Sequence, residues 1–169
     1  YKRHHRFQNA LSDLRVGVLD AITGYEHREE RNKQLKRFAE TLQQFGFSVT
    51  RAAEPVFINE KSKDTIRKEV MNGLNQLVSA HPDIILIYLN NDDELADDEL
   101  SIYNTAKRIC IGHGIPSQII KANTINNKWA YDNILMGIIG KTGNIPYVLA
   151  NPIEYTDILV GLDVSRRIK

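Results

Sequence analysis

The sequence lacks several features that mark common classes of protein. It contains one cysteine, Cys110, so no disulfide can form within the chain. No apolar run approaches the length of a membrane span or a signal sequence. The 22 basic and 21 acidic residues nearly cancel, so the surface as a whole does not attract a polyanion. We therefore expect a cytoplasmic protein without membrane contact, in which any anion site arises from a local cluster.

Two familiar chemical motifs are also missing. The histidines, which we expect to be structural or surface residues like Cys110, show no paired metal-ligand spacing: His4, His5, His27, His81 and His113. The run Gly140-Lys141-Thr142 is similar to the end of a phosphate-binding P-loop, but that motif requires a glycine where Leu135 stands. The P-loop also runs from strand to helix, the reverse of the order expected here. Nucleotide hydrolysis through a P-loop is therefore not expected.

The chain shows a regular alternation of strand-like and helix-like segments, and its 169 residues with 42% hydrophobic composition can bury one ordinary core. We expect strands at 14–19, 47–52, 83–89, 118–121 and 146–150, and helices at 28–45, 62–80, 99–112 and 126–141. This order predicts an α/β fold with a doubly wound, mainly parallel, Rossmann-like sheet and helices on both faces. Such sheets bind ligands beyond the carboxyl ends of their strands, so the loops after Leu89 and before Gln118 are expected to border the ligand crevice.

Four residues of the C-terminal half combine cations, hydrogen-bond donors and an aromatic face: Tyr103, Lys107, Gln118 and Lys141. Tyr103 and Lys107 stand four apart in an expected helix and therefore share a flank. A terminal phosphate prefers ammonium groups and neutral donors over carboxylates, and an aromatic ring can stack on a base. The set predicts a pocket for the phosphorylated 5′ end of a nucleic-acid strand.

The order and spacing of these residues resemble the MID domain of Argonaute and PIWI proteins. The resemblance rests on Tyr-x-x-x-Lys at 103–107, on Ile115-Pro116-Ser117-Gln118, and on Asn133-Ile134-Leu135-Met136-Gly137 through Lys141 to Ile145-Pro146. It covers about residues 83–165. It implies that the tyrosine stacks on the first guide base while the two lysines and the glutamine hold the 5′ phosphate. It also makes Asn123 a weaker candidate for a contact with the guide backbone.

Two properties of the family bear on how the phosphate is neutralised. Members from animals and plants often carry a second lysine one turn before the last one, and this chain has Gly137 there. Prokaryotic relatives, which this chain resembles more, commonly use a divalent cation held partly by the C-terminal carboxylate of the full-length protein. The resemblance therefore implies Mg²⁺ at the 5′-phosphate pocket of a parent protein, and the metal ligands within this chain are unknown.

The same resemblance divides the chain into a MID domain at 1–151 and the truncated start of a PIWI domain, an RNase H-like nuclease, at 152–169. Asp163 would be the first metal-binding carboxylate of the parent nuclease. One aspartate cannot hold a catalytic metal pair, so we expect no catalytic residue and no cleavage in this chain. The implied partners are a 5′-phosphorylated guide RNA or DNA and the remaining domains of a parent protein, a guide-directed endonuclease acting in gene silencing or host defence.

Other interpretations stay open at this point. One is a nucleotide-binding or small-molecule-binding α/β enzyme that uses Lys141 and the acidic loop 90–99. Another is a structural interaction domain whose phosphate signature no longer functions. The acidic loop is most simply a solvated segment with helix-capping carboxylates, although the resemblance would place it over the first guide base. Trp129 is expected to pack in the interior rather than to stack on a ligand.

Overall fold

The computed structural model describes residues 12–22, 28–59, 63–91 and 101–145. The elements follow the chain as β1 (Asp13–Asp20), α1 (Arg28–Gln44), β2 (Ser48–Arg51), β3 (Val56–Phe57), α2 (Lys63–Ser79), β4 (Ile84–Leu89), α3 (Ile102–Gly112), β5 (Ser117–Lys121), the 3₁₀ turn η3 (Ala122–Thr124) and α4 (Lys128–Lys141). The predicted alternation of strands and helices is confirmed over this part of the chain. The expected strand at 146–150 and Asp163 lie outside the described residues.

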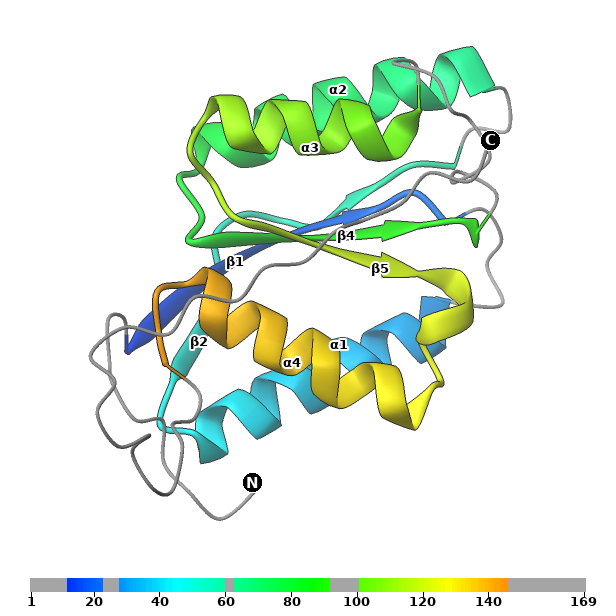
Figure 1. Ribbon diagram of the computed structural model, residues 1–169. Helices are drawn as coiled ribbons and strands as arrows, with labels where there is room; N and C mark the ends of the chain where they lie inside the picture. The colour runs from blue at the N-terminus through cyan, green and yellow to red at the C-terminus, as the bar shows by residue number, and fades with distance from the viewer. Residues whose placement is uncertain (1–11, 23–27, 60–62, 92–100, 146–169) are drawn as a thin grey trace, which may run out of the picture.

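The five strands form one parallel sheet in the order β2-β1-β4-β5, with β3 beside the end of β1 (Figure 1). Strands β2 and β3 share one edge of the sheet, because β2 pairs with the first half of β1 and β3 with its last two residues. Strand β5 lies at the other edge and pairs with β4 from Ser117 to Lys121. The chain crosses from β1 to one side and from β4 to the other, which is the doubly wound arrangement predicted from the sequence.

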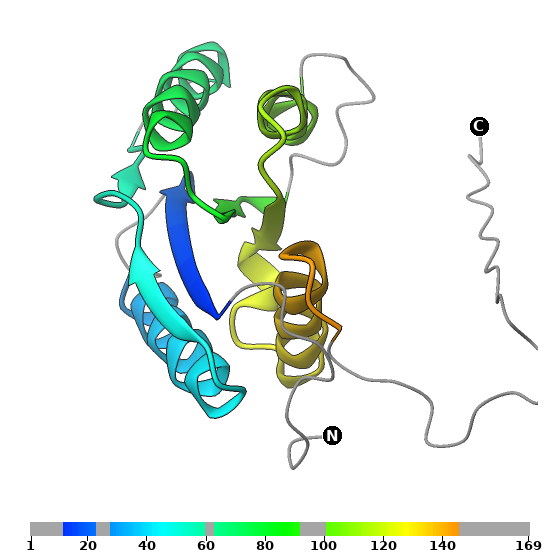
Figure 2. The ribbon, with the colours of Figure 1, turned by 90° about the vertical axis from the view of Figure 1, so that its left-hand side faces the viewer.

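Helices cover both faces of this sheet. Helices α2 and α3 lie on one face, and α1 and α4 lie on the other (Figures 1 and 2). Every residue of β4 is buried, as expected for an apolar strand between two helical layers. Alternate β4 residues contribute to two separate cores: Ile84, Leu86 and Tyr88 pack with α1 and α4, while Ile85, Ile87 and Leu89 pack with α2 and α3. Among the described residues, no helix is long and apolar enough to cross a membrane.

Local signals place the two helices that flank β5. Ser101 caps α3 by accepting a hydrogen bond from the Asn104 amide, and Asn127 caps α4 by accepting from the amides of Trp129 and Ala130. Because Asn127 provides this cap, α4 begins at Lys128, two residues later than its apolar pattern predicts. Helix α4 ends at Lys141, and Gly143 then turns the chain with φ of 78°.

One prediction about the ligand crevice is wrong. The loop after Leu89 leaves the carboxyl end of β4, whereas the loop before Gln118 leads into the amino end of β5. Since β4 and β5 are parallel, these two loops lie at opposite ends of the sheet and cannot border one crevice. The sequence also did not predict the two-residue strand β3 or the 3₁₀ turn η3, which are too short to show a period.

Candidate nucleic-acid interface

Two ammonium groups meet at the amino end of the edge strand β5. Lys107 from α3 donates to the Ser117 carbonyl at 3.1 Å, and Lys141 from the end of α4 donates to the same oxygen at 3.0 Å. The two Nζ atoms are therefore at most two hydrogen-bond lengths apart. Lys107 also donates to the Ser117 hydroxyl at 3.1 Å. The helices on opposite faces of the sheet thus deliver their lysines around one edge.

Among the described strands, β5 has a neighbour only on its β4 side, which explains why a carbonyl is available on its other side. The backbone amide of Ile85 in β4 donates a hydrogen bond to the Pro116 carbonyl at 3.0 Å. The next carbonyl along the strand, that of Ser117, therefore points away from the sheet. Lysine side chains on an open strand edge also discourage pairing with another strand. The lysine cluster, defined as Lys107, Lys141 and the Ser117 group that they share, is thus built on the edge itself.

Gln118 belongs to the same site. Its side-chain oxygen accepts from Lys141 at 2.7 Å, while its amide nitrogen donates to the Ile119 carbonyl at 3.0 Å. The amide therefore lies along the outer edge of β5, next to the ammonium of Lys141. Three of the four residues predicted from the sequence are brought together by direct contacts.

Gly137 makes room for this arrangement. A Cβ at position 137 would lie 2.8 Å from the Gln118 side-chain oxygen, closer than carbon and oxygen normally approach. The absence of a side chain at 137 therefore lets the glutamine amide rest against α4. In this chain the Gln118 amide occupies the space beside Gly137.

Tyr103 stands at the border of the cluster. Its ring lies one turn before Lys107 on α3, with 6.0 Å between the ring centroid and the Lys107 Nζ. The residue is 37% exposed, so part of its side chain is accessible to a ligand. The structure thus gathers all four predicted residues on one side of the molecule, along β5 and the helices beside it.

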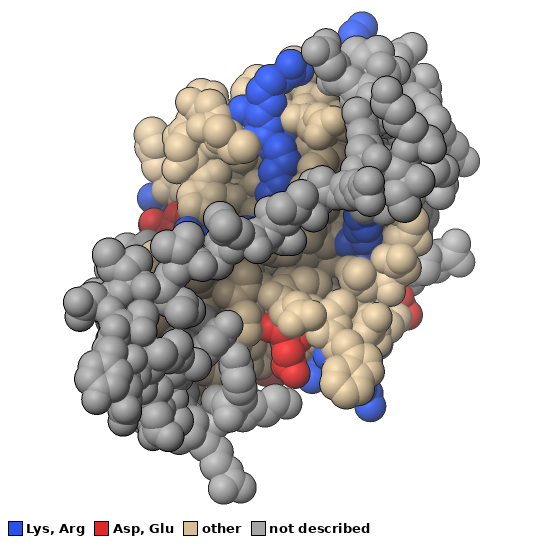
Figure 3. All heavy atoms as spheres, in the orientation of Figure 1, with Lys and Arg blue, Asp and Glu red and all other residues tan. Residues whose placement is uncertain are grey.

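No carboxylate of the described residues balances the charges of this cluster. Among the described residues, neither lysine forms an ion pair with a carboxylate, whereas ion pairs are present at Arg31 and Lys36. Partial burial lowers the pKa of Lys107, and burial together with the nearby charge of Lys107 lowers the pKa of Lys141. In Figure 3, basic side chains form a column across the α3 part of this face. The site therefore favours an incoming anion.

Ser117 is the part of the site that the sequence did not single out. It is buried and supplies its carbonyl to both lysines. The Cys110 thiol also contacts it, and burial raises the pKa of that thiol, which agrees with the structural role expected for Cys110. In the sequence, the position of Ser117 directly before Gln118 was the only hint of its role. A serine next to a turn does not by itself predict contacts with two lysines.

Two predicted features lie elsewhere. Asn123 is in η3, beyond the carboxyl end of β5, and its amide donates to the Asn91 side chain at 3.1 Å. It is therefore separated from the lysine cluster by the length of the strand. Trp129 is 87% exposed in the first turn of α4, so the prediction that it packs in the interior is wrong. The acidic residues at 92–99 lie outside the described residues.

The oxygen atoms of the described residues at this site do not by themselves form a binding site for a magnesium ion. Mg²⁺ prefers carboxylate, carbonyl and water oxygens, but the Ser117 and Gln118 oxygens already accept from lysines, whose charges oppose a cation. Within the described ranges, no three histidine, cysteine, aspartate or glutamate side chains come together to hold a metal.

The run Gly140-Lys141-Thr142 does not form a P-loop. It lies at the end of α4, whereas a P-loop leads into the start of a helix.

No family model matches the sequence. A curated Argonaute protein of Aquifex aeolicus is 24% identical over 151 residues, which cover 86% of this chain and 21% of the relative. This chain therefore spans about a fifth of that protein's length. A solved structure of the Aquifex aeolicus Argonaute superimposes with a TM-score of 0.71 at 20% identity, over 88% of this chain and 22% of that chain.

Two further solved structures share the fold. The Argonaute MID domain of Arabidopsis thaliana gives a TM-score of 0.62 at 17% identity, over 81% of this chain and 94% of that domain. The Argonaute of Clostridium butyricum, bound to a guide DNA and a target DNA, gives 0.61 at 20% identity, over 87% of this chain and 22% of that chain. This chain is therefore similar in sequence to a curated Argonaute and shares the fold of these Argonaute structures, including an isolated MID domain.

Proposed function

We propose that this chain binds the phosphorylated 5′ end of a nucleic-acid guide strand at the lysine cluster. The observation that carries the proposal is the convergence of Lys107 and Lys141 on the Ser117 carbonyl without a carboxylate among the described residues. Two like charges repel, so holding them together is unfavourable unless an anion joins them. A phosphate brings close to two negative charges and several acceptor oxygens.

The rest of the site suits the terminal nucleotide. The Gln118 amide is within reach of the Lys141 ammonium and can turn to donate to a phosphate oxygen. Tyr103 presents an exposed ring beside Lys107, on which the first base can stack. Charged hydrogen bonds contribute roughly 1.5 to 3 kcal/mol each, and a stacked base roughly 1 to 3 kcal/mol. The phosphate contacts therefore decide end recognition, and the ring adds an affinity that depends little on the phosphate.

The larger setting of this site is also part of the proposal. We infer a guide RNA or DNA as the partner, held together with other domains of a multidomain Argonaute in the cytoplasm. Residues 1–151 would then form the MID domain and 152–169 the start of PIWI. Asp163 would contribute to a guide-directed nuclease only in the parent protein. Asn123 stays a candidate for a contact farther along the guide backbone, beyond the first nucleotide.

The experiment is a titration of the 169-residue chain with short fluorescent oligonucleotides, followed by anisotropy. Oligomers with 5′-phosphate, 5′-triphosphate and 5′-hydroxyl ends are compared in both RNA and DNA, with and without Mg²⁺. We expect the 5′-phosphate to bind at least tenfold more tightly than the 5′-hydroxyl. Equal affinity for the two ends would refute the phosphate site. A preference that requires Mg²⁺ would assign the cation to the phosphate rather than to the described side chains.

Tyr103 provides an internal check on the division of roles. Tyr103→Ala should weaken both oligomers by a similar factor of about ten, because a stacked base contributes roughly 1 to 3 kcal/mol. Tyr103→Phe keeps the ring and is the matched control. If Tyr103→Ala removed only the phosphate preference, the ring would act on the phosphate and not on the base. Turnover of a nucleoside triphosphate, lost in Lys141→Ala, would instead support the enzyme interpretation.

A further inference from the structure

A cavity lies on the α1 side of the sheet, beside β2, β1 and β4, and contains no residue of the lysine cluster. It has a volume of about 480 Å³ and lies between α1 and the sheet face that α1 covers. Its apolar walls come from both layers and include Val16, Val18, Leu35, Phe38 and Leu86. Exposed residues at its mouth include Lys36 and Arg51. Known small-molecule sites have volumes of roughly 300 to 1,000 Å³ and mostly apolar walls.

The broken edge strand accounts for this cavity. Strand β2 ends at Arg51 and β3 begins at Val56, so the middle of β1 has no strand partner on that side. Backbone pairing resumes where Leu19 lies opposite Val56, and the Ile58 amide then donates to the Asp20 carbonyl at 2.8 Å. Protein interiors normally pack with few voids larger than a water molecule. A hollow of this size beside a core strand therefore suggests a site for a ligand rather than a packing fault.

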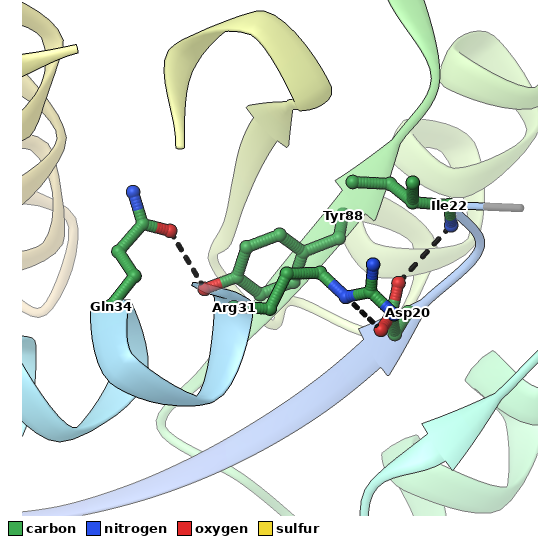
Figure 4. Close-up of polar contacts among 5 residues, drawn as sticks. All are labelled: Asp20, Ile22, Arg31, Gln34 and Tyr88. Carbon is green, nitrogen blue, oxygen red and sulfur yellow. Dashed lines mark hydrogen bonds and ion pairs between the residues drawn. The ribbon is translucent and has the colours of Figure 1, made fainter. Parts of the chain in front are cut away.

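Figure 4 shows two groups of polar contacts, one between Tyr88 and Gln34 and one among Arg31, Asp20 and Ile22, which lie next to the cavity. Arg31, 4% exposed, pairs through its Nε with the Asp20 carboxylate. The Tyr88 hydroxyl donates to the Gln34 side chain at 3.0 Å, and that side chain in turn donates to the Ile125 carbonyl at 2.9 Å. Asp20, Arg31 and Tyr88 all border the cavity. These two groups of contacts are placed toward the carboxyl ends of the central strands β1 and β4.

Hydrogen bonds do not satisfy every donor of the Arg31 guanidinium. Among the described residues, the Nη1 of Arg31 has no hydrogen-bond partner although the atom is buried. Buried polar groups in folded proteins are normally paired, so an unpaired guanidinium N–H beside a cavity indicates that an acceptor belongs there. The Ile22 amide donates to one Asp20 carboxylate oxygen at 3.1 Å, and the Arg31 Nε pairs with the other oxygen. The unmet need is therefore for an acceptor, not for a donor.

The charge of the pair restricts what this acceptor can be. Asp20 and Arg31 neutralise each other, so a charged ligand would add an uncompensated buried charge, which is strongly unfavourable. A carbonyl oxygen satisfies Nη1 without adding charge. The apolar walls require the rest of the ligand to be apolar. The two constraints together select a neutral molecule with one exposed carbonyl group.

We propose that this cavity binds a small, neutral, mainly apolar molecule whose carbonyl oxygen accepts a hydrogen bond from Arg31. The site is distinct from the lysine cluster, because the cavity lining includes none of its residues. Binding therefore requires neither a phosphate nor a nucleic acid, and it can be measured on the chain alone.

The test uses three probes of matched size with the full 169-residue chain. Phenylacetamide carries the neutral carbonyl, phenylacetate carries a charge, and ethylbenzene carries no acceptor. Two-dimensional amide NMR follows the titration, with shifts expected near the cavity. Phenylacetamide should saturate at millimolar concentration, as befits a ligand of this size, and should bind at least fivefold more tightly than either other probe.

Two variants and one control locate the effect. Ala39→Phe places a ring into the cavity from α1 and should abolish binding of phenylacetamide. The double variant Asp20→Asn/Arg31→Leu removes both charges at once and should reduce the preference for phenylacetamide over ethylbenzene to about one. Met136→Phe fills a different hollow, between α1 and α4, and should leave binding unchanged.

Several outcomes would overturn the proposal. Absence of saturable binding by phenylacetamide would show that the cavity takes no such ligand. Unchanged binding in Ala39→Phe, whose fold circular dichroism would verify, would place the probe elsewhere. Equal binding of phenylacetamide and ethylbenzene, or an undiminished preference in the double variant, would show that Arg31 does not supply the hydrogen bond.

Discussion

The two edges of the sheet hold positive charge in opposite ways. At the β5 edge, Lys107 and Lys141 lie together, partly accessible and without a carboxylate partner among the described residues. Toward the edge formed by β2 and β3, Arg31 is almost fully buried and paired with Asp20 of β1. An unpaired cationic cluster at the surface is suited to an external anion, whereas a neutralised pair in the interior is suited to a neutral ligand. The counter-charge, rather than the cation, therefore distinguishes the two sites.

The largest expected effect concerns the buried pair. Arg31→Leu leaves the Asp20 carboxylate buried without its partner, which should lower the free energy of unfolding by about 3 to 5 kcal/mol. Asp20→Asn/Arg31→Leu removes both charges and should cost much less. Urea unfolding at pH 7 followed by circular dichroism measures both values. A double variant as unstable as the single one would show that packing of the Arg31 side chain, and not charge compensation, stabilises this edge.

Removing the lysine cluster should instead affect binding and leave stability nearly unchanged. The double variant Lys107→Ala/Lys141→Ala loses two charged hydrogen bonds to the phosphate, each contributing roughly 1.5 to 3 kcal/mol. The preference for a 5′-phosphate over a 5′-hydroxyl should fall by about 100-fold or more in anisotropy titrations. Lys128→Ala, at the opposite end of α4, is the matched control. If Lys128→Ala lost the same 5′-phosphate preference, the effect would come from the overall surface charge and not from the lysine cluster.

Gly137 tests whether the placement of Gln118 matters. Gly137→Ala puts a Cβ 2.8 Å from the glutamine oxygen and should displace the amide, weakening 5′-phosphate binding by about tenfold, equivalent to one hydrogen bond of roughly 1 to 1.5 kcal/mol. Gly140→Ala on the same helix meets no atom within 4 Å. It should leave binding intact and stabilise the helix by up to about 1 kcal/mol. If both variants bind equally well, the amide is not part of the phosphate site.

The smallest expected effect is the pH dependence of phosphate recognition. Burial, and for Lys141 the charge of Lys107, lowers the pKa of both lysines below the ordinary 10.5. Because the phosphate binds the charged form, the 5′-phosphate preference should decline as pH rises through these lowered values, earlier than for ordinary lysines. It should also decline below about pH 6, where the phosphate gains a proton. Anisotropy across pH 5.5 to 10 measures this, and a constant ratio over the alkaline range would contradict the role of the lysines.

Some features of the site could be predicted because they are local. Helical spacing predicted that Tyr103 and Lys107 share one flank. In the structure, the Lys107 Nζ lies 6.0 Å from the centroid of the Tyr103 ring. The apolar run of β4 predicted a strand covered on both faces, and all of its residues are buried. Regular periods of this kind are set by backbone geometry within a few residues, so they can be recognised without knowledge of the rest of the fold.

Other features depend on contacts between distant segments. The Ser117 carbonyl joins helices from opposite faces of the sheet, and no local pattern indicates that meeting. The pairing of Asp20 with Arg31 depends on how α1 packs beneath the sheet. The exposure of Trp129 shows the same limit, because residue type alone does not determine which side of a helix faces the core.

The sequence by itself determined the order of strands and helices and the residue types that suit a 5′ phosphate, because periodicity and side-chain chemistry are properties of short segments. The tertiary structure decided that two lysines would share one carbonyl, that Gly137 would leave room for Gln118, and that a cavity would open beside Arg31. These features require segments far apart in the chain to pack against one sheet, and their geometry exists only once that packing is complete.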